Sequence, residues 1–126
     1  MFADFLKSSQ QEPFLWGKND CALWCASAVE HVTGYDPAKD LRGKYSTWFE
    51  CRRLIMEAGG LEQLIAPRMK RFGPLDGDGV AIVRLGKQKM CGLIYGGRLV
   101  VRPQNRNGLL FMDKYKIVRG WSWSRH

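Results

Sequence analysis

Histidine is scarce in this sequence of 126 residues, which contains only His31 and His126. Imidazole serves in many catalytic and metal sites, so few sites of that kind can be assembled here. Long apolar runs are also absent, because no segment approaches the roughly 20 residues that cross a bilayer as a helix. The first nine residues include the acidic Asp4 and no long apolar core. We therefore expect no signal peptide, no membrane span, and folding in the cytoplasm.

Cysteine is present four times, at Cys21, Cys25, Cys51 and Cys91. Intracellular thiols usually stay reduced, so we expect no disulfides. Cys21 and Cys25 stand one helical turn apart, a spacing that provides at most half of a metal site. The two histidines do not complete a zinc motif. The sequence therefore predicts no structural zinc and no other cofactor.

Acidic residues are outnumbered, since 20 lysines and arginines against 12 aspartates and glutamates give a net charge of +8. The basic residues are scattered, and their densest cluster is at residues 68–71. No helix-turn-helix or zinc-finger spacing accompanies that cluster. We interpret the charge as a basic soluble surface, and nucleic acid is an unlikely partner.

Apolar residues at helical spacing and capping residues indicate the helices. They predict helices from residue 2 to 9, from 19 or 20 to 32, from 47 to 58 and from 61 to 65. Apolar, β-rich runs between turns predict strands over residues 80–85, 90–95, 98–102, 109–112 and 115–118. Helices followed by an antiparallel meander indicate one α+β domain over residues 1–126. Its N-terminal helices would pack on an antiparallel sheet of about five strands.

The stretch from Phe14 to Cys25 is where the sequence proposes chemistry. A turn leads to Asp20 and then to Cys21, which opens a helix rich in small residues. A cysteine in the first helical turn lies near unpaired N–H groups and the positive end of the helix dipole, and both favour the thiolate. Cys21 is therefore a candidate nucleophile. The alternative is that it only packs as a small apolar side chain, which is the expectation for Cys25 and Cys91.

Three stretches resemble the NlpC-type branch of the papain-like cysteine peptidases, and in particular its small phage-encoded members found with tail genes. They are Trp16-Gly17 with Asp20-Cys21, Leu75-Asp76-Gly77-Asp78, and the run from Met90 to Gly97. The loop from Leu41 to Tyr45 also resembles the phage subgroup. The resemblance implies a helix bearing Cys21 packed on an antiparallel sheet. It also implies an ancestral attack of a thiol on amide bonds of peptidoglycan, the bacterial cell wall.

The resemblance fails at the catalytic base. The family's histidine stands directly before a small Val-Gly pair, which places Met90 at that position, or Cys91 if the alignment moves by one residue. Neither side chain can take the proton of a thiol. His31 follows Cys21 by ten residues, about 15 Å along a helix, which is too far for a hydrogen bond. The third polar residue of the family falls within residues 102–105.

The tryptophans have two interpretations, as core residues or as walls of a binding surface. We expect Trp24 and Trp48 in the core. Trp16, together with Asp20, is a candidate for a substrate groove. Trp121 and Trp123 alternate with serine in a final strand and are interface candidates, docking either on the domain or on a neighbour.

The leading hypothesis from the sequence is a virion component of a phage or prophage tail tip, with a structural or assembly role. It would be a pseudoenzyme with a degenerate cysteine-peptidase fold whose partners are other tail proteins. It would reside in the host cytoplasm during assembly and then in the virion tail. The alternative is an active hydrolase of cell-wall peptides with Cys21 as nucleophile. A weaker alternative is a nucleic-acid-binding module, whose affinity would fall steeply with salt.

Overall fold

A six-stranded sheet is the centre of the fold in the computed structural model, which describes residues 2–104 and 108–125. All of its strand pairs are antiparallel. Their spatial order is β1-β6-β2-β3-β4-β5, so the last strand of the chain pairs between β1 and β2. The strands are β1 (Phe72–Pro74), β2 (Gly79–Leu85), β3 (Gln88–Tyr95), β4 (Arg98–Val101), β5 (Leu110–Met112) and β6 (Lys116–Arg125).

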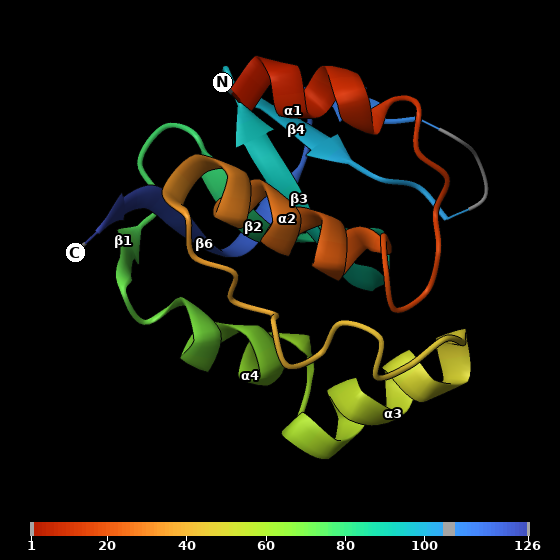
Figure 1. Cartoon of the computed structure of the whole chain (residues 1–126). Helices are drawn as coiled ribbons and strands as arrows, with labels where there is room; N and C mark the ends of the chain where they lie inside the picture. Colours follow the sequence, from red (N-terminus) through yellow and green to blue (C-terminus); the bar gives the residue numbers. More distant parts are fainter. Residues whose placement is uncertain (1, 105–107, 126) are drawn as a thin grey trace.

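The helices lie on one side of this sheet, with α2 across it and α3 and α4 on an arm beside α2 (Figure 1). None of the helices in the described residues is long and apolar enough to span a membrane. At the start of α3, Thr47 accepts a hydrogen bond from the Glu50 N–H, which is half of the predicted capping box. The helices are α1 (Phe2–Ser9), α2 (Cys21–Thr33), α3 (Trp48–Ala58) and α4 (Leu61–Ile65), followed by the 3₁₀ turn η1 (Ala66–Met69).

Strand alternation divides the core into two layers, because successive side chains point to opposite faces of a sheet. The face beneath α2 carries Val80, Ile82, Cys91, Leu93, Val100 and Trp121, which pack with Trp24, Cys25 and Val29 of the helix. The opposite face carries Ala81, Val83, Ile94, Leu99 and Val101, against which Met90 and Leu85 pack. This division decides which residues of β3 can face α2.

The predicted α+β class is confirmed, with six strands instead of about five. Phe72–Pro74 forms β1, although glycine and proline made this segment resemble a turn, because it pairs with β6 at the edge of the sheet. The predicted core position of Trp24 is also confirmed, since this side chain is 1% exposed. Trp48 was assigned to the core wrongly, because it is 43% exposed at the start of α3.

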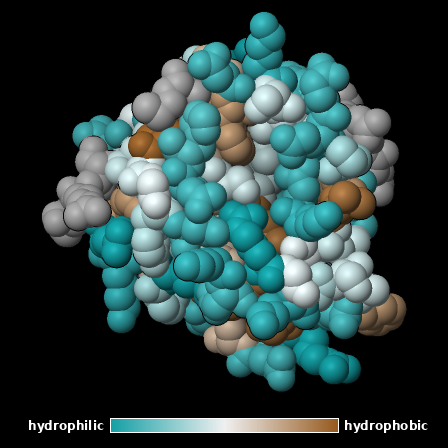
Figure 2. Space-filling view, in the orientation of Figure 1, coloured by the Kyte–Doolittle hydropathy of each residue, from teal (hydrophilic) through white to brown (hydrophobic). Residues whose placement is uncertain are grey.

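Helix α3 explains the exposure of Trp48, because none of its residues is fully buried. Phe49 and Met56 are also exposed on this helix, and the Arg52 guanidinium lies 5.3 Å from the centre of the Trp48 ring. The face of the molecule seen in Figure 2 is mainly hydrophilic, with small, separated hydrophobic areas. Helix α3 is therefore held less firmly by burial than α2, which buries six of its residues.

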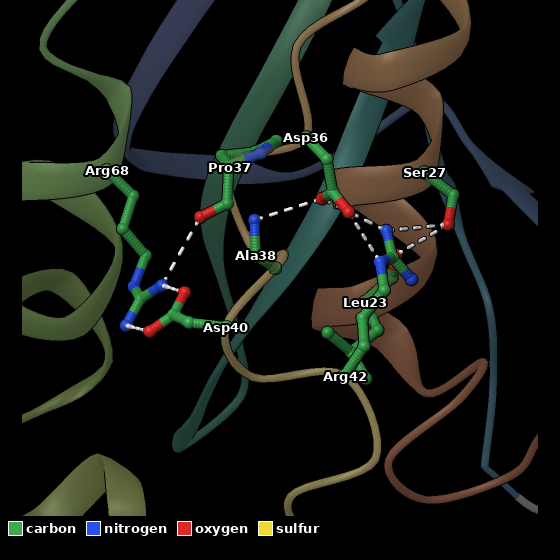
Figure 3. A network of polar contacts seen from close by, with 8 residues as sticks. All are labelled: Leu23, Ser27, Asp36, Pro37, Ala38, Asp40, Arg42 and Arg68. Carbon is green, nitrogen blue, oxygen red and sulfur yellow. Dashed lines mark hydrogen bonds and ion pairs between the residues drawn. The ribbon is translucent and has the colours of Figure 1, made fainter.

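Two arginines hold the loop that follows α2 (Figure 3). Arg42 donates to both carboxylate oxygens of Asp36, at 2.7 and 3.2 Å, and to the Ser27 hydroxyl on α2 at 3.1 Å. Arg68 of η1 pairs with Asp40 and donates to the Pro37 carbonyl at 3.3 Å. These contacts join the loop to α2 and to η1. Tyr45 lies further along the same loop, at the candidate site.

Candidate functional site

Asp20 shapes the turn that precedes Cys21. One of its carboxylate oxygens accepts a hydrogen bond from the Leu23 N–H at 3.1 Å and so caps α2. The other accepts hydrogen bonds from the Gly17 N–H at 2.9 Å and from the Tyr45 hydroxyl at 2.7 Å. Asp20 is only 1% exposed. Asp20 also lines a groove beside Cys21, the position predicted for it, while all three hydrogen bonds serve the turn itself.

Gly17 is required by the same turn. Its φ is +79°, and a Cβ at this position would lie 1.7 Å from the Tyr45 carbonyl oxygen. Its own carbonyl accepts a hydrogen bond from the Gly43 N–H at 2.9 Å. The turn before α2 and the loop before α3 are therefore in direct contact, which only a glycine allows.

Cys21 is the first residue of α2 and is partly exposed. It lines a groove of about 300 Å³ whose walls come from α2, α3 and β3, with Phe14 at its rim. Cys51 and Ile55 of α3 stand in the wall opposite α2, and Lys89 of β3 contributes a positive charge. The fold thus places the candidate nucleophile in a groove, as the resemblance implies.

The thiol of Cys21 is not activated, contrary to the expectation from the helix dipole. Burial, together with the negative charge of Asp20, raises the pKa of this thiol to about 12. Hydrogen bonds from the N–H groups of Cys91 and Ala22 lower the pKa but do not compensate. The thiolate fraction at pH 7 is then on the order of 10⁻⁵. The loss of hydration raises the pKa of the Cys21 thiol by more than the positive end of the helix dipole lowers it.

Of the two candidate base positions on β3, Cys91 is the one that lies under α2. Its side chain lies on the α2 face of the sheet and is 2% exposed, whereas Met90 packs with the apolar layer on the opposite face and also lines the groove. The difference follows from strand alternation, since successive residues of β3 point to opposite faces. Met90 as the position where the family has histidine stays a prediction. Burial raises the pKa of the Cys91 thiol, so it supplies no base.

The described residues bring no imidazole to the groove. His31 lies in the last turn of α2, where its ring is 5.5 Å from that of Phe5. His126 lies outside the described residues. At the third polar position of the family, Arg102 lines the groove and its guanidinium donates to the Ser9 and Glu12 carbonyls at 2.5 and 2.6 Å. Its buried Nε has no hydrogen-bond partner among the described residues. Asn105, at the end of the predicted range, lies outside the described residues.

The aromatic candidates pack within the domain. Trp16 does not line the groove and instead packs edge-on against Phe14, with ring centres 4.8 Å apart, and against the cluster around Tyr45. Trp121 is 4% exposed in the core, and Trp123 packs edge-on against Phe2 at 5.2 Å. Of the two alternatives for Trp121 and Trp123, docking on the domain or on a neighbour, the structure shows both rings on their own domain.

Sequence reasoning missed Tyr45 and Cys51. Tyr45 is buried and donates to Asp20, and Cys51 lines the groove beside Cys21. The only signal for Tyr45 was its place at the end of the loop that resembles the phage subgroup. Burial raises the pKa of the Cys51 thiol, and the charge of Asp20 adds to this effect. Asp20, Cys21 and Cys51 therefore form one site that favours protonated thiols.

An apolar cavity of about 60 Å³ lies next to the groove, between α2 and the arm of α3 and α4. The groove and the cavity share Ala22, Cys51, Ile55 and Leu61, so they adjoin. All four cysteines carry free thiols. Among residues 2–104 and 108–125, no group of three or more histidine, cysteine or acidic side chains is arranged to hold a metal ion.

Comparison with known proteins gives one match. A family model with the description "Domain of unknown function (DUF6950)" matches residues 1–123. No curated protein and no solved structure matches the chain. The match covers nearly the whole sequence, including the turn, the groove and every strand.

Proposed function

The chain belongs to the DUF6950 family, and we propose that it is a structural or assembly component of a phage or prophage tail tip with a degenerate NlpC-like centre. In this proposal the groove at Cys21 binds a partner segment and does not cleave it. The observation that carries the proposal is the pairing of a nucleophile-position cysteine with Cys91, where a base is required.

The chemistry of the groove supports a role without catalysis. Attack on an amide needs a thiolate and a group that protonates the leaving amine. Cys21 is held as a thiol with a pKa of about 12, and the residues that line the groove include no histidine. A neighbouring thiol such as Cys91, itself buried and with a raised pKa, cannot replace imidazole near neutral pH.

The placement in a tail rests on the resemblance of the turn at Cys21, the Asp76-Gly77-Asp78 segment and β3 to small phage-encoded proteins. The physical support is narrower. A groove lined by Phe14 and Lys89 is present at Cys21, although the catalytic pair lacks a base.

The test separates a structural role from a catalytic one. In the phage or prophage that carries the gene, deletion should abolish infective particles, and the Cys21→Ser variant should restore them as well as the parent. Serine keeps the size of the side chain but is a much weaker nucleophile without a base. Failure of Cys21→Ser to restore particles, while the variant folds like the parent, would contradict the proposal.

The second candidate is an active cell-wall peptide hydrolase. It is favoured by one observation, the position of Cys21 at the start of α2, where the backbone N–H groups of Cys91 and Ala22 lower the pKa of its thiol. It predicts release of fragments from peptidoglycan stem peptides and complete loss of that activity in Cys21→Ser. Absence of fragments from the parent protein removes this candidate.

A further inference from the structure

Three basic residues stand in one row across the centre of the sheet. In the register of the strands, Arg84 of β2 is directly opposite Lys89 of β3 on one side and Lys116 of β6 on the other. Directly opposed residues share a face, and neighbouring strands lie about 4.8 Å apart, so the row is about 10 Å long. All three side chains are exposed.

This basic row has no acidic partner. Within the described residues, no carboxylate forms an ion pair with Arg84, Lys89 or Lys116. Arg119 lies further along β6 on the same face of the sheet. Unlike the three residues of the row it has an acidic neighbour, because Glu62 of α4 lies 3.7 Å from its guanidinium. Like charges directly opposed in a sheet are destabilising. A row of three is therefore a feature that folding alone does not favour.

The basic row is continuous with the groove at Cys21, because Lys89 belongs to both. Beyond Lys89 the groove becomes apolar at Ala22, Ile55 and Leu61, which also border the 60 Å³ cavity. A ligand that covers the whole surface would meet a small apolar recess at one end and three cations at the other. The negative charge of Asp20 disfavours an anion beside Cys21, so the carboxylates of such a ligand belong along the row and not at the Cys21 end of the groove.

We infer that the groove and the basic row together bind an extended acidic segment of a partner protein, with a small aliphatic side chain at the recess and carboxylates along Lys89, Arg84 and Lys116. Charge complementarity and the adjoining recess identify the partner as a peptide. A single-stranded nucleic acid would need stacking rings along the row. Among residues 2–104 and 108–125, Phe14 is the one aromatic side chain that lines the groove. The inference deepens the proposed function, because it names the chemistry of the partner that the same groove holds.

The test uses the full chain and fluorescein-labelled probes in anisotropy titrations. The probes are a peptide of valines followed by glutamates, the same peptide with lysines in place of glutamates, and an oligothymidine of equal charge. The variant is Arg84→Glu, which places an acid between two lysines. The matched control is Lys70→Glu, which makes the same change of charge at an exposed position outside the groove and the row.

We expect the acidic peptide to bind, and Arg84→Glu to weaken binding about tenfold while Lys70→Glu changes it little. Arg84→Glu should also unfold at a temperature equal to or above that of the parent, which shows that lost binding is not lost folding. Equal weakening by both variants, tighter binding of oligothymidine, or no binding of the acidic peptide would each overturn the inference. Cleavage of stem peptides would instead contradict the proposed function, so the two failures are distinguishable.

Discussion

The backbone N–H of Cys91 faces the Cys21 thiol closely enough to lower its pKa, which places the middle of β3 beside the first residue of α2. The Cys91 side chain lies on the same face of the sheet, beneath the helix. Whatever side chain stands at position 91 is therefore the natural neighbour of the thiol. In this protein it is a second buried thiol, which neither removes a proton from Cys21 nor stabilises its thiolate.

A histidine at position 91 should activate the neighbouring thiol. We expect Cys91→His to raise the alkylation rate of Cys21 by iodoacetamide at pH 7 by about tenfold or more, because an imidazole beside a thiol favours the thiolate. Met90→His is the matched variant and should raise the rate less, since residue 90 packs with the layer on the other face even though it also lines the groove. Mass spectrometry of the Cys21 peptide measures both rates.

The larger side chain at position 91 has some room, because Cys91 borders the 60 Å³ cavity. Overpacking should still cost about 1–3 kcal/mol of unfolding free energy, which chemical denaturation measures in both variants. A faster rate for Met90→His than for Cys91→His, with both proteins folded, would contradict the assignment of the base position to residue 91.

The parent protein should show an unreactive Cys21 thiol whose alkylation rises about tenfold per pH unit beyond pH 9, because its pKa is about 12. In the urea-unfolded chain the profile should instead level near the ordinary value of 9.0. A folded-state pKa above the unfolded one contributes stability below pH 9 that is lost as the pH rises further. A folded-state profile that levels at or below pH 9 would refute the buried, neutral thiol.

The helix caps and the hairpin turn near the site could be predicted from the sequence. Asp20 caps α2, and Thr47 with Glu50 begins α3, because capping depends on a few neighbouring residues. The glycine pair 96–97 closes the hairpin of β3 and β4 with positive φ at both residues. Each of these features needs only short stretches of chain, so residue type and spacing are sufficient to predict it.

The properties of the site that depend on residues distant in the sequence could not be predicted from the sequence. The choice between Met90 and Cys91 requires knowledge of which face of β3 lies under α2. The pKa of Cys21 depends on how completely α3 and β3 remove water from it, and the helix dipole alone suggested the opposite direction. Trp48 was placed in the core because it is large and apolar, but α3 buries none of its residues fully.

The hydrogen bond from Tyr45 to Asp20 should be worth more than an exposed one. We expect Tyr45→Phe to lower the free energy of unfolding by about 1–3 kcal/mol, because the buried carboxylate loses a charge-assisted donor. Tyr115→Phe is the control, since its hydroxyl donates to the Gly97 carbonyl at 2.8 Å in an exposed setting. Its expected cost is about 0.5 kcal/mol or less. Equal losses in urea unfolding would contradict the role of Tyr45 in holding the turn.

Acid should weaken the loop that follows α2. Burial alone would raise the pKa of the Asp36 carboxyl, but hydrogen bonds from Arg42 and the Ala38 N–H outweigh it and hold the pKa below its usual 3.8. The resulting stability is present above that value and is lost as the pH falls through the lower folded-state pKa. We expect Asp36→Asn to reduce the loss of stability between pH 5 and about pH 2.

The control for this titration is Asp76→Asn, in the exposed turn before β2. Thermal unfolding across the acidic range measures the free energy of both variants. An unchanged pH dependence in Asp36→Asn, together with a reduced one in Asp76→Asn, would show that the Asp36–Arg42 pair does not hold the loop.

The most direct test of the central claim is to incubate the parent protein and its Cys21→Ser variant with peptidoglycan stem peptides at neutral pH and to analyse the products by mass spectrometry. A protonated Cys21 with no base at residue 91 predicts intact peptides in both samples. Fragments released by the parent protein and absent with Cys21→Ser would contradict the account, because they would show that the groove cleaves what it binds.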